Sequence, residues 1–175
     1  ARLIEDQDLT FDGLDLPIVT REFAELRRGL VLLTGATGSG KSTTLAAMIN
    51  HINANFCRHI MTIEDPIEFL HVDKKSVVNQ REVGFDTASF GDALRHVVRQ
   101  SPDVILIGEM RDNDTMMTAI SAAETGHLVL STLHTSDVSH TMDRIINYFP
   151  DHLKPQVRQE LALSLEGIIC MRLLR

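Results

Sequence analysis

The sequence predicts an α/β fold with a mostly parallel sheet flanked by helices. From Gly29 onward, short β-branched runs alternate with stretches of helical periodicity, which is typical of strands joined through helices. Apolar residues make up 43% of the 175 residues, which is enough for one ordinary core. No internal repeat or low-complexity segment interrupts the pattern, so we expect residues 29–175 to form one compact unit.

Strands are expected wherever a short apolar or β-branched run ends in polar residues or glycine. In chain order these runs are 29–35 (GLVLLTG), 59–65 (HIMTIED), 76–83 (SVVNQREV), 103–109 (DVILIGE) and 127–134 (HLVLSTLH). Ligands of open α/β sheets bind beyond the carboxyl ends of the strands. The polar residues that follow these runs are therefore the first candidates for a functional site.

Helices are expected where apolar residues recur at a spacing of three or four. This spacing predicts amphipathic helices over 45–52 and 90–97, and a last helix over 157–168. Residues 1–28 have scattered apolar positions without sustained periodicity. We expect them to be a linker or the start of the domain.

Composition excludes several classes of protein. The net charge of -7 and an aromatic content of 5% argue against a partner that is a nucleic acid, which needs basic patches and stacking platforms. Cys57 and Cys170 belong to no CxxC pair, so a disulfide or zinc framework is not expected. No apolar run is long enough to span a membrane, and the acidic start does not resemble a signal peptide. We expect a cytoplasmic protein.

A complete P-loop pattern follows the first expected strand. Residues 35–42 read G-A-T-G-S-G-K-S and match G-x-x-x-x-G-K-[ST]. Glycines let backbone N–H groups turn toward phosphates, and the following helix adds its positive end. We expect Lys41 to reach the β- and γ-phosphates and to pack against nothing in the ligand-free core. The candidate nucleotide-binding residues are Gly35, Ala36, Thr37, Gly38, Ser39, Gly40, Lys41, Ser42 and Thr43, with Ser42 also binding Mg²⁺.

Two further segments place acids at strand ends. The run 103–112 (DVILIGEMRD) has the shape of a Walker B element, with Glu109 as the candidate for contact with Mg²⁺ or water. The segment TIEDPIEF carries Glu64, Asp65 and Glu68 around a proline, which suits metal coordination or a base that orients water. An acidic surface turn is the alternative for this second segment, and composition leaves the two interpretations equal.

A histidine and several arginines complete the candidates. His134 lies at the nucleotide side of the last expected strand, although a lone histidine is more often a structural hydrogen-bonding group. Arg95 lies on the polar face of an expected helix, and Arg111 follows Glu109. Most surface arginines are solvated or salt-bridged, and Arg95 can be no more than that.

The order of these segments resembles the secretion ATPase superfamily of type II secretion and type IV pili. The resemblance rests on GATGSGKSTTLAAMI, MTIEDPIEF, NQREVG, RQSPDVILIGEMRD and AETGHLVLSTLHT, which cover nearly all of residues 27–135 in the family's order. They resemble that family's Walker A, Asp box, Walker B and His box. The segment MDRIINYFPDHLKPQVRQELALSLEGII is similar to the twitching-motility retraction branch, and REVGFDT and DRIINYFP point to its accessory paralogue.

The resemblance implies a RecA-like motor that binds ATP with Mg²⁺ between the subunits of a homohexamer and drives pilus retraction. It implies Glu68 as the base that polarises water with Glu64 in support, Glu109 as the Walker B acid and His134 as a γ-phosphate sensor. Arg95 and Arg111 match arginines that act across a subunit boundary. The implied location is cytoplasmic, peripheral at the inner-membrane pilus base, with the platform protein and related pilus motors as partners.

The resemblance also suggests that the chain is a motor fragment. The family's smaller N-terminal domain is absent, Arg2 resembles the end of the linker from it, and the final C-terminal helices are missing after Arg175. The alternatives are a motor for pilus assembly or type II secretion, a nucleic-acid translocase on the same core, and a nucleotide-sensing subunit without hydrolysis.

Overall fold

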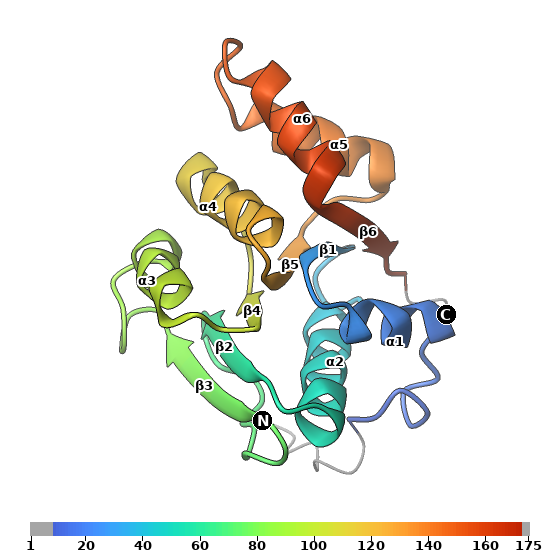
Figure 1. The fold of residues 1–175 in the computed structure, drawn as a ribbon. Coiled ribbons are helices and arrows are strands. Elements are labelled where there is room, and N and C mark those ends of the chain that lie inside the picture. The colour runs from blue at the N-terminus through green and yellow to red at the C-terminus, as the bar shows by residue number, and fades with distance from the viewer. Residues whose placement is uncertain (1–8, 173–175) are drawn as a thin grey trace.

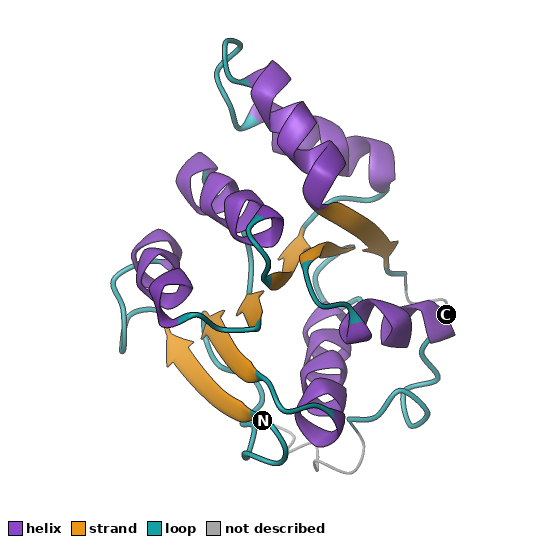
Figure 2. Ribbon diagram, viewed as in Figure 1, coloured by secondary structure: helices purple, strands orange, loops and turns teal. Residues whose placement is uncertain are grey.

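The fold is an α/β sandwich around one parallel sheet. The computed structural model describes residues 9–172. In this part of the chain, six strands form a sheet in the order β3-β2-β4-β5-β1-β6, and every neighbouring pair is parallel. Figure 1 and Figure 2 show helices on both faces of this sheet. The predicted fold class is confirmed.

The elements alternate along the chain as the sequence predicts. The strands are β1 Gly29–Thr34, β2 His59–Glu64, β3 Val77–Glu82, β4 Val104–Ile107, β5 Leu128–Leu133 and β6 Leu165–Cys170. The helices are α1 Ile18–Glu25, α2 Lys41–Asn55, α3 Phe90–Val97, α4 Asn113–Glu124, α5 Val138–Asn147 and α6 Lys154–Ser164, with a short 3₁₀ turn η2 at Val98–Gln100. None of these helices is long and apolar enough to cross a bilayer.

Each central strand is apolar along its whole length because both of its faces are buried. In β1, Leu30 and Leu32 belong to a core that lies against α3 to α6, whereas Val31 and Leu33 belong to a second core against α1 and α2. The same alternation runs through β4 and β5. The two cores hold the central strands fixed, so the loops after the strands start from a rigid base.

The last expected helix, over 157–168, is wrong in its final four residues. Helix α6 ends at Ser164, and Leu165 to Cys170 form β6 instead of another helical turn. Strand β6 pairs with β1, whose outer edge it covers. The spacing of Leu165 and Ile168 fits a helix, but the unpaired backbone groups of β1 offer hydrogen bonds that a helix there cannot satisfy. Helices α1, α4 and α5 are additional to those we expected.

The segment before β1 packs on the core. Phe11 and Ala24 are buried, and helix α1 lies against α2 and β6. Asn50 of α2 donates a hydrogen bond to the carbonyl of Leu9 (2.9 Å). Residues 9–28 are thus attached to the sheet, while Arg2 lies outside the described residues.

The close packing of α1 against β6 can be tested by mutation. A Cβ atom on Gly167 of β6 would lie 2.2 Å from Cζ of Phe23 in α1. We expect Gly167→Ala to lower the free energy of unfolding by about 1–3 kcal/mol, because the methyl group overpacks the interface. Chemical denaturation measures this change.

The matched control is the double variant Gly167→Ala with Phe23→Leu, in which the smaller side chain leaves room for the methyl group. It should be more stable than the sum of the two single changes predicts. Additive losses would show that the ring and the glycine do not meet.

Candidate active site

The P-loop forms the turn between β1 and α2. Gly35 has a φ of +145°, and a Cβ there would lie 2.5 Å from the carbonyl oxygen of Met171 and 2.6 Å from Oγ of Ser39. Gly40 is the N-cap directly before α2 and has a left-handed φ of +93°. Glycine is therefore required at both ends of the loop, at Gly35 for space and at Gly40 for backbone conformation.

Lys41 is folded back onto its own loop. Its Nζ donates hydrogen bonds to the carbonyls of Gly35 and Ala36, both at 2.8 Å, and the residue is 7% exposed. Burial lowers the pKa of Lys41, and the negative charge of Glu109 opposes that shift. The expectation that Lys41 packs against nothing in the ligand-free core is wrong, because its ammonium group holds the loop together.

The loop residues fit a polyphosphate. Ser39 is buried, and its Oγ has no hydrogen-bond partner among the described residues. Ala36, Thr37 and Gly38 are exposed beside it, and α2 points its N-terminus at the same space. An unpaired hydroxyl, free loop positions and a helix N-terminus together suit an anion with several oxygen atoms.

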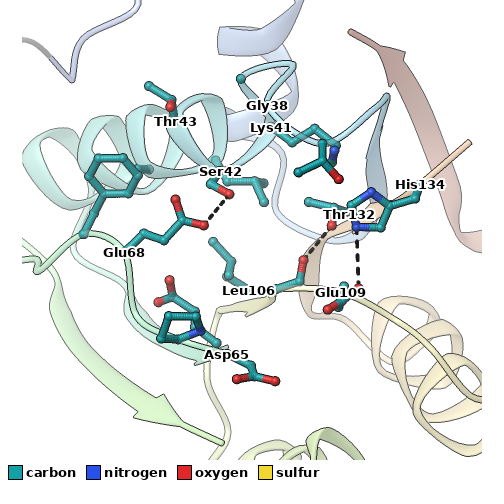
Figure 3. Close-up of a pocket in the computed structure, with 18 of the residues that line it drawn as sticks. Gly38, Lys41, Ser42, Thr43, Asp65, Glu68, Leu106, Glu109, Thr132 and His134 are labelled. Carbon is teal, nitrogen blue, oxygen red and sulfur yellow. Dashed lines mark hydrogen bonds and ion pairs between the residues drawn. The ribbon is translucent and has the colours of Figure 1, made fainter. Parts of the chain in front are cut away.

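Glu68 faces the start of α2 from the loop after β2. Its Oε1 accepts a hydrogen bond from Oγ of Ser42 at 2.9 Å, as Figure 3 shows. Glu68 is exposed and lines the same cavity as Lys41 and Thr43. The structure therefore brings a solvent-accessible carboxylate to the mouth of the P-loop.

Glu64 ends β2 in a more enclosed position. Its Oε1 accepts hydrogen bonds from Oγ1 of Thr62 (2.7 Å) and from Nε2 of Gln80 (3.2 Å). Burial raises the pKa of Glu64 above its ordinary value, the two hydrogen bonds oppose that shift, and the nearby charge of Glu68 adds to it. Glu64 is thus a poorly hydrated carboxylate held in a fixed orientation.

Glu109 follows β4 after Gly108. Its side chain is 16% exposed, forms an ion pair with Arg111 and lies 3.6 Å from Nε2 of His134. Thr132 of β5 donates a hydrogen bond from Oγ1 to the carbonyl of Gly108 (2.7 Å), which fixes the backbone just before the acid. Figure 3 shows the contact of His134 with Glu109 and the hydrogen bond of Thr132 on the side of the cavity opposite Glu68.

One cavity of about 410 Å³ joins these groups. It is within the usual size range of small-molecule sites. The predicted site residues that line it are Thr37, Gly38, Gly40, Lys41, Ser42, Thr43, Glu64, Glu68, Glu109 and His134. Gly35 and Ala36 line an adjacent hollow, which His134 also borders. Four loops, after β1, β2, β4 and β5, therefore meet at one place.

The two arginines lie outside this cavity. Arg95 of α3 pairs with Asp114 of α4 and lies 3.5 Å from Asp92, and its side chain is 54% exposed. Arg111 pairs with Glu109 and is 65% exposed. Both guanidinium groups thus have partners in their own chain, and their action across a subunit boundary stays a prediction.

Sequence reasoning did not single out Thr132 and Gln80 as site residues. Thr132 lines the cavity one residue before the end of β5, and Gln80 lies on β3 beside Glu64. The register of the parallel sheet is the signal that identifies Gln80, since it lies directly opposite Thr62. That register is visible only when the strands are paired.

A P-loop and strand-end acids on one parallel sheet define a P-loop protein of the α/β class. The chain belongs to the family of type II/IV secretion system proteins, whose model matches residues 5–175.

Among individual relatives, the chain is similar to the type IV pilus retraction ATPase PilT of Pseudomonas aeruginosa. The two are 51% identical over 174 residues, which cover 99% of this chain and 51% of the relative. A twitching motility protein of Neisseria gonorrhoeae is 53% identical, with 99% of this chain and 46% of the relative covered. The chain thus spans about half the length of the curated relatives it matches.

A solved structure agrees with these relatives. The crystal structure of the pilus retraction motor PilT with bound ADP is 53% identical and superposes with a TM-score of 0.89, over 99% of this chain and 49% of that one.

The raised pKa of Glu64 gives a prediction for stability. Because folding raises this pKa above its ordinary value of 4.5, the folded state binds the proton more tightly. The stability of the wild type should therefore fall, relative to Glu64→Gln, as the pH rises from about 4.5 through the raised pKa. Chemical denaturation of both proteins between pH 4 and pH 8 measures the difference.

Glu124→Gln is the control, because Glu124 is an exposed acid at the end of α4. The Glu64→Gln difference is compared with that of this control and should change more with pH. A Glu64→Gln difference that is constant, or that moves in favour of the wild type as the pH rises, would contradict the burial of this carboxylate.

Proposed function

We propose that this chain binds and hydrolyses ATP, and that the protein to which it belongs uses this hydrolysis to retract type IV pili. The observation that supports hydrolysis most strongly is the single cavity in which the P-loop faces Glu68 and Glu109. Support for retraction comes from the relatives, which are named as a pilus retraction ATPase and a twitching motility protein.

The P-loop is proposed to bind the phosphates. Backbone N–H groups of the glycine turn and the N-terminus of α2 would face the phosphate oxygens. Lys41 would exchange its two carbonyl partners for oxygens of the β- and γ-phosphates, which keeps its buried ammonium group hydrogen-bonded throughout. Without nucleotide, the loop carbonyls thus hold the ammonium group of Lys41 in a position from which it can turn to the phosphates.

Ser42 and Glu109 are proposed to hold Mg²⁺ together with the nucleotide. A hydroxyl and a carboxylate suit this cation, which is usually bound through one or two protein oxygens and the substrate phosphates. When bound, Mg²⁺ would neutralise charge on the phosphate oxygens. His134, 3.6 Å from Glu109, would report the state of the terminal phosphate through that acid.

Glu68 is proposed as the base that orients the attacking water. It is exposed, as is Asp65, but it is the acid whose carboxylate accepts a hydrogen bond from Ser42 at the entrance of the P-loop. Oε1 of Glu64 already accepts hydrogen bonds from Thr62 and Gln80, and Glu64 is less exposed than Glu68. We therefore assign Glu64 a supporting electrostatic role.

The remaining proposals concern assembly. A homohexamer would place exposed Arg95 or Arg111 near a neighbouring nucleotide, where an arginine can raise the rate about 10³- to 10⁵-fold. The proposed partners are the pilus platform protein and related motors at the inner membrane, on its cytoplasmic side. The net charge of -7 supports a protein partner over a nucleic acid.

The proposed base gives a prediction that separates binding from chemistry. Glu68→Gln keeps the shape of the side chain and one oxygen that can accept the hydrogen bond from Ser42, but it removes the charge, so ATP should still bind while turnover falls about 10²-fold or more. Titration with a fluorescent ATP analogue and a steady-state phosphate assay measure the two quantities. In cells that lack the gene, the variant should restore no twitching and leave excess surface pili.

Glu124→Gln serves as the matched control and should keep wild-type turnover and motility, since Glu124 lies on α4 away from the cavity. If Glu68→Gln hydrolyses ATP normally and Glu109→Gln is the inactive variant, the choice of base is wrong. Cells that lose their pili when the gene is deleted would show a motor for assembly rather than retraction.

A further inference from the structure

Strand β3 holds the loop that carries the proposed base. This strand is at one edge of the sheet, next to β2, as Figure 1 shows. The residues Gln80 and Glu82 are opposite Thr62 and Glu64 in the parallel register. Because side chains two apart on a strand share a face, Gln80 and Glu82 point to the side of the sheet where Thr62 and Glu64 also lie.

Gln80 makes three hydrogen bonds that connect this face to the loop. Its Nε2 donates to Oε1 of Glu64 (3.2 Å) and to the carbonyl of Phe69 (2.8 Å), and its Oε1 accepts from the backbone N–H of His71 (2.8 Å). Both ends of the amide are thus used, the donor end twice and the acceptor end once. Only a side chain with a donor and an acceptor at this length satisfies all three partners.

Glu82 anchors the same loop one step earlier. Its Oε2 accepts a hydrogen bond from the backbone N–H of Ile67 at 2.9 Å. Ile67 and Phe69 are the two neighbours of Glu68 in the chain, so β3 holds one backbone group of the residue on each side of the proposed base. The carboxylate of Glu68 accepts a hydrogen bond from Ser42 of the P-loop, and the backbone N–H of Glu68 donates to the carboxylate of Glu64.

We propose that Gln80 is a positioning residue for hydrolysis, which sets the location of Glu68 through the backbone of residues 69–71 and the orientation of Glu64 directly. This inference rests on the proposed role of Glu68 as the base. Gln80 does not itself line the cavity. Among the described residues its hydrogen bonds go to Glu64, Phe69 and His71, which line the cavity but are not part of the P-loop, so its effect reaches the site through these residues and through Glu68 beside them. It should therefore alter the chemical step and leave nucleotide binding unchanged.

Mutation of Gln80 tests this role in the intact protein. Gln80→Leu keeps the size of the side chain and removes all three hydrogen bonds, and Gln80→Glu keeps the acceptor and replaces the donor end with an oxygen. A displacement of a catalytic group by about 1 Å can cost about 10²-fold in rate. We expect kcat to fall about tenfold to a hundredfold in both variants, with the affinity for a fluorescent ADP analogue within twofold of the wild type.

Asn79→Leu is the matched control. Asn79 is the neighbouring amide on β3, is exposed, and contacts His59 (3.1 Å) instead of the loop. It should keep the wild-type kcat. Hydrogen exchange gives a second measurement that does not depend on activity: the amide of His71 should exchange faster in Gln80→Leu than in the wild type or in Asn79→Leu.

The outcomes are distinct. A kcat equal to that of Asn79→Leu would overturn the proposal, as would a parallel loss of nucleotide affinity and melting temperature, which indicates a merely structural role. A wild-type protein that binds ATP without hydrolysing it would refute the proposed function instead. The exchange rate of residues 67–71 would then decide by itself whether β3 holds the loop.

Discussion

The register of the parallel sheet is the constraint on which the site depends. Ile63 of β2 is opposite Ile107 of β4, Ile107 is opposite Ser131 of β5, and Thr34 of β1 is opposite Leu133 of β5. Because all these strands run in the same direction, the residues that follow them emerge at one edge. The two apolar cores fix each strand from both faces, so the loops cannot shift independently of the sheet. A slip of one residue in any strand would turn its side chains to the opposite face.

The charged groups around the cavity have partners that a bound nucleotide and its cation could replace. Without phosphate, the buried ammonium group of Lys41 is satisfied by two carbonyls of its own loop, and Glu68 takes its hydrogen bond from Ser42. Glu64 and Glu109 add two more acids to the same space. Each of these interactions can be exchanged for a phosphate oxygen or a cation at little net cost in hydrogen bonds. Binding therefore rearranges partners around a scaffold that is already formed.

Much of this arrangement was predictable from local patterns. Apolar or β-branched runs that end in polar residues or glycine identified five of the strands, and the spacing of the P-loop residues identified the phosphate site. The sixth strand was not predictable, because Leu165 and Ile168 fit a helical period and only the open edge of β1 decides their conformation. Gln80 was not predicted as a site residue for a related reason, since its role depends on strand pairing. Tertiary contacts, rather than propensity, decide both cases.

The central claim is that the P-loop binds the terminal phosphate and that Glu68 orients the water that attacks this same phosphate. The most direct test is a crystal structure of the protein with a non-hydrolysable ATP analogue and Mg²⁺. The account predicts that the three phosphates lie along residues 35–42, that Lys41 Nζ has left the carbonyls of Gly35 and Ala36 for phosphate oxygens, and that the γ-phosphate is the one nearest Glu68. An analogue whose terminal phosphate points away from Glu68, or one bound outside this cavity, would contradict it.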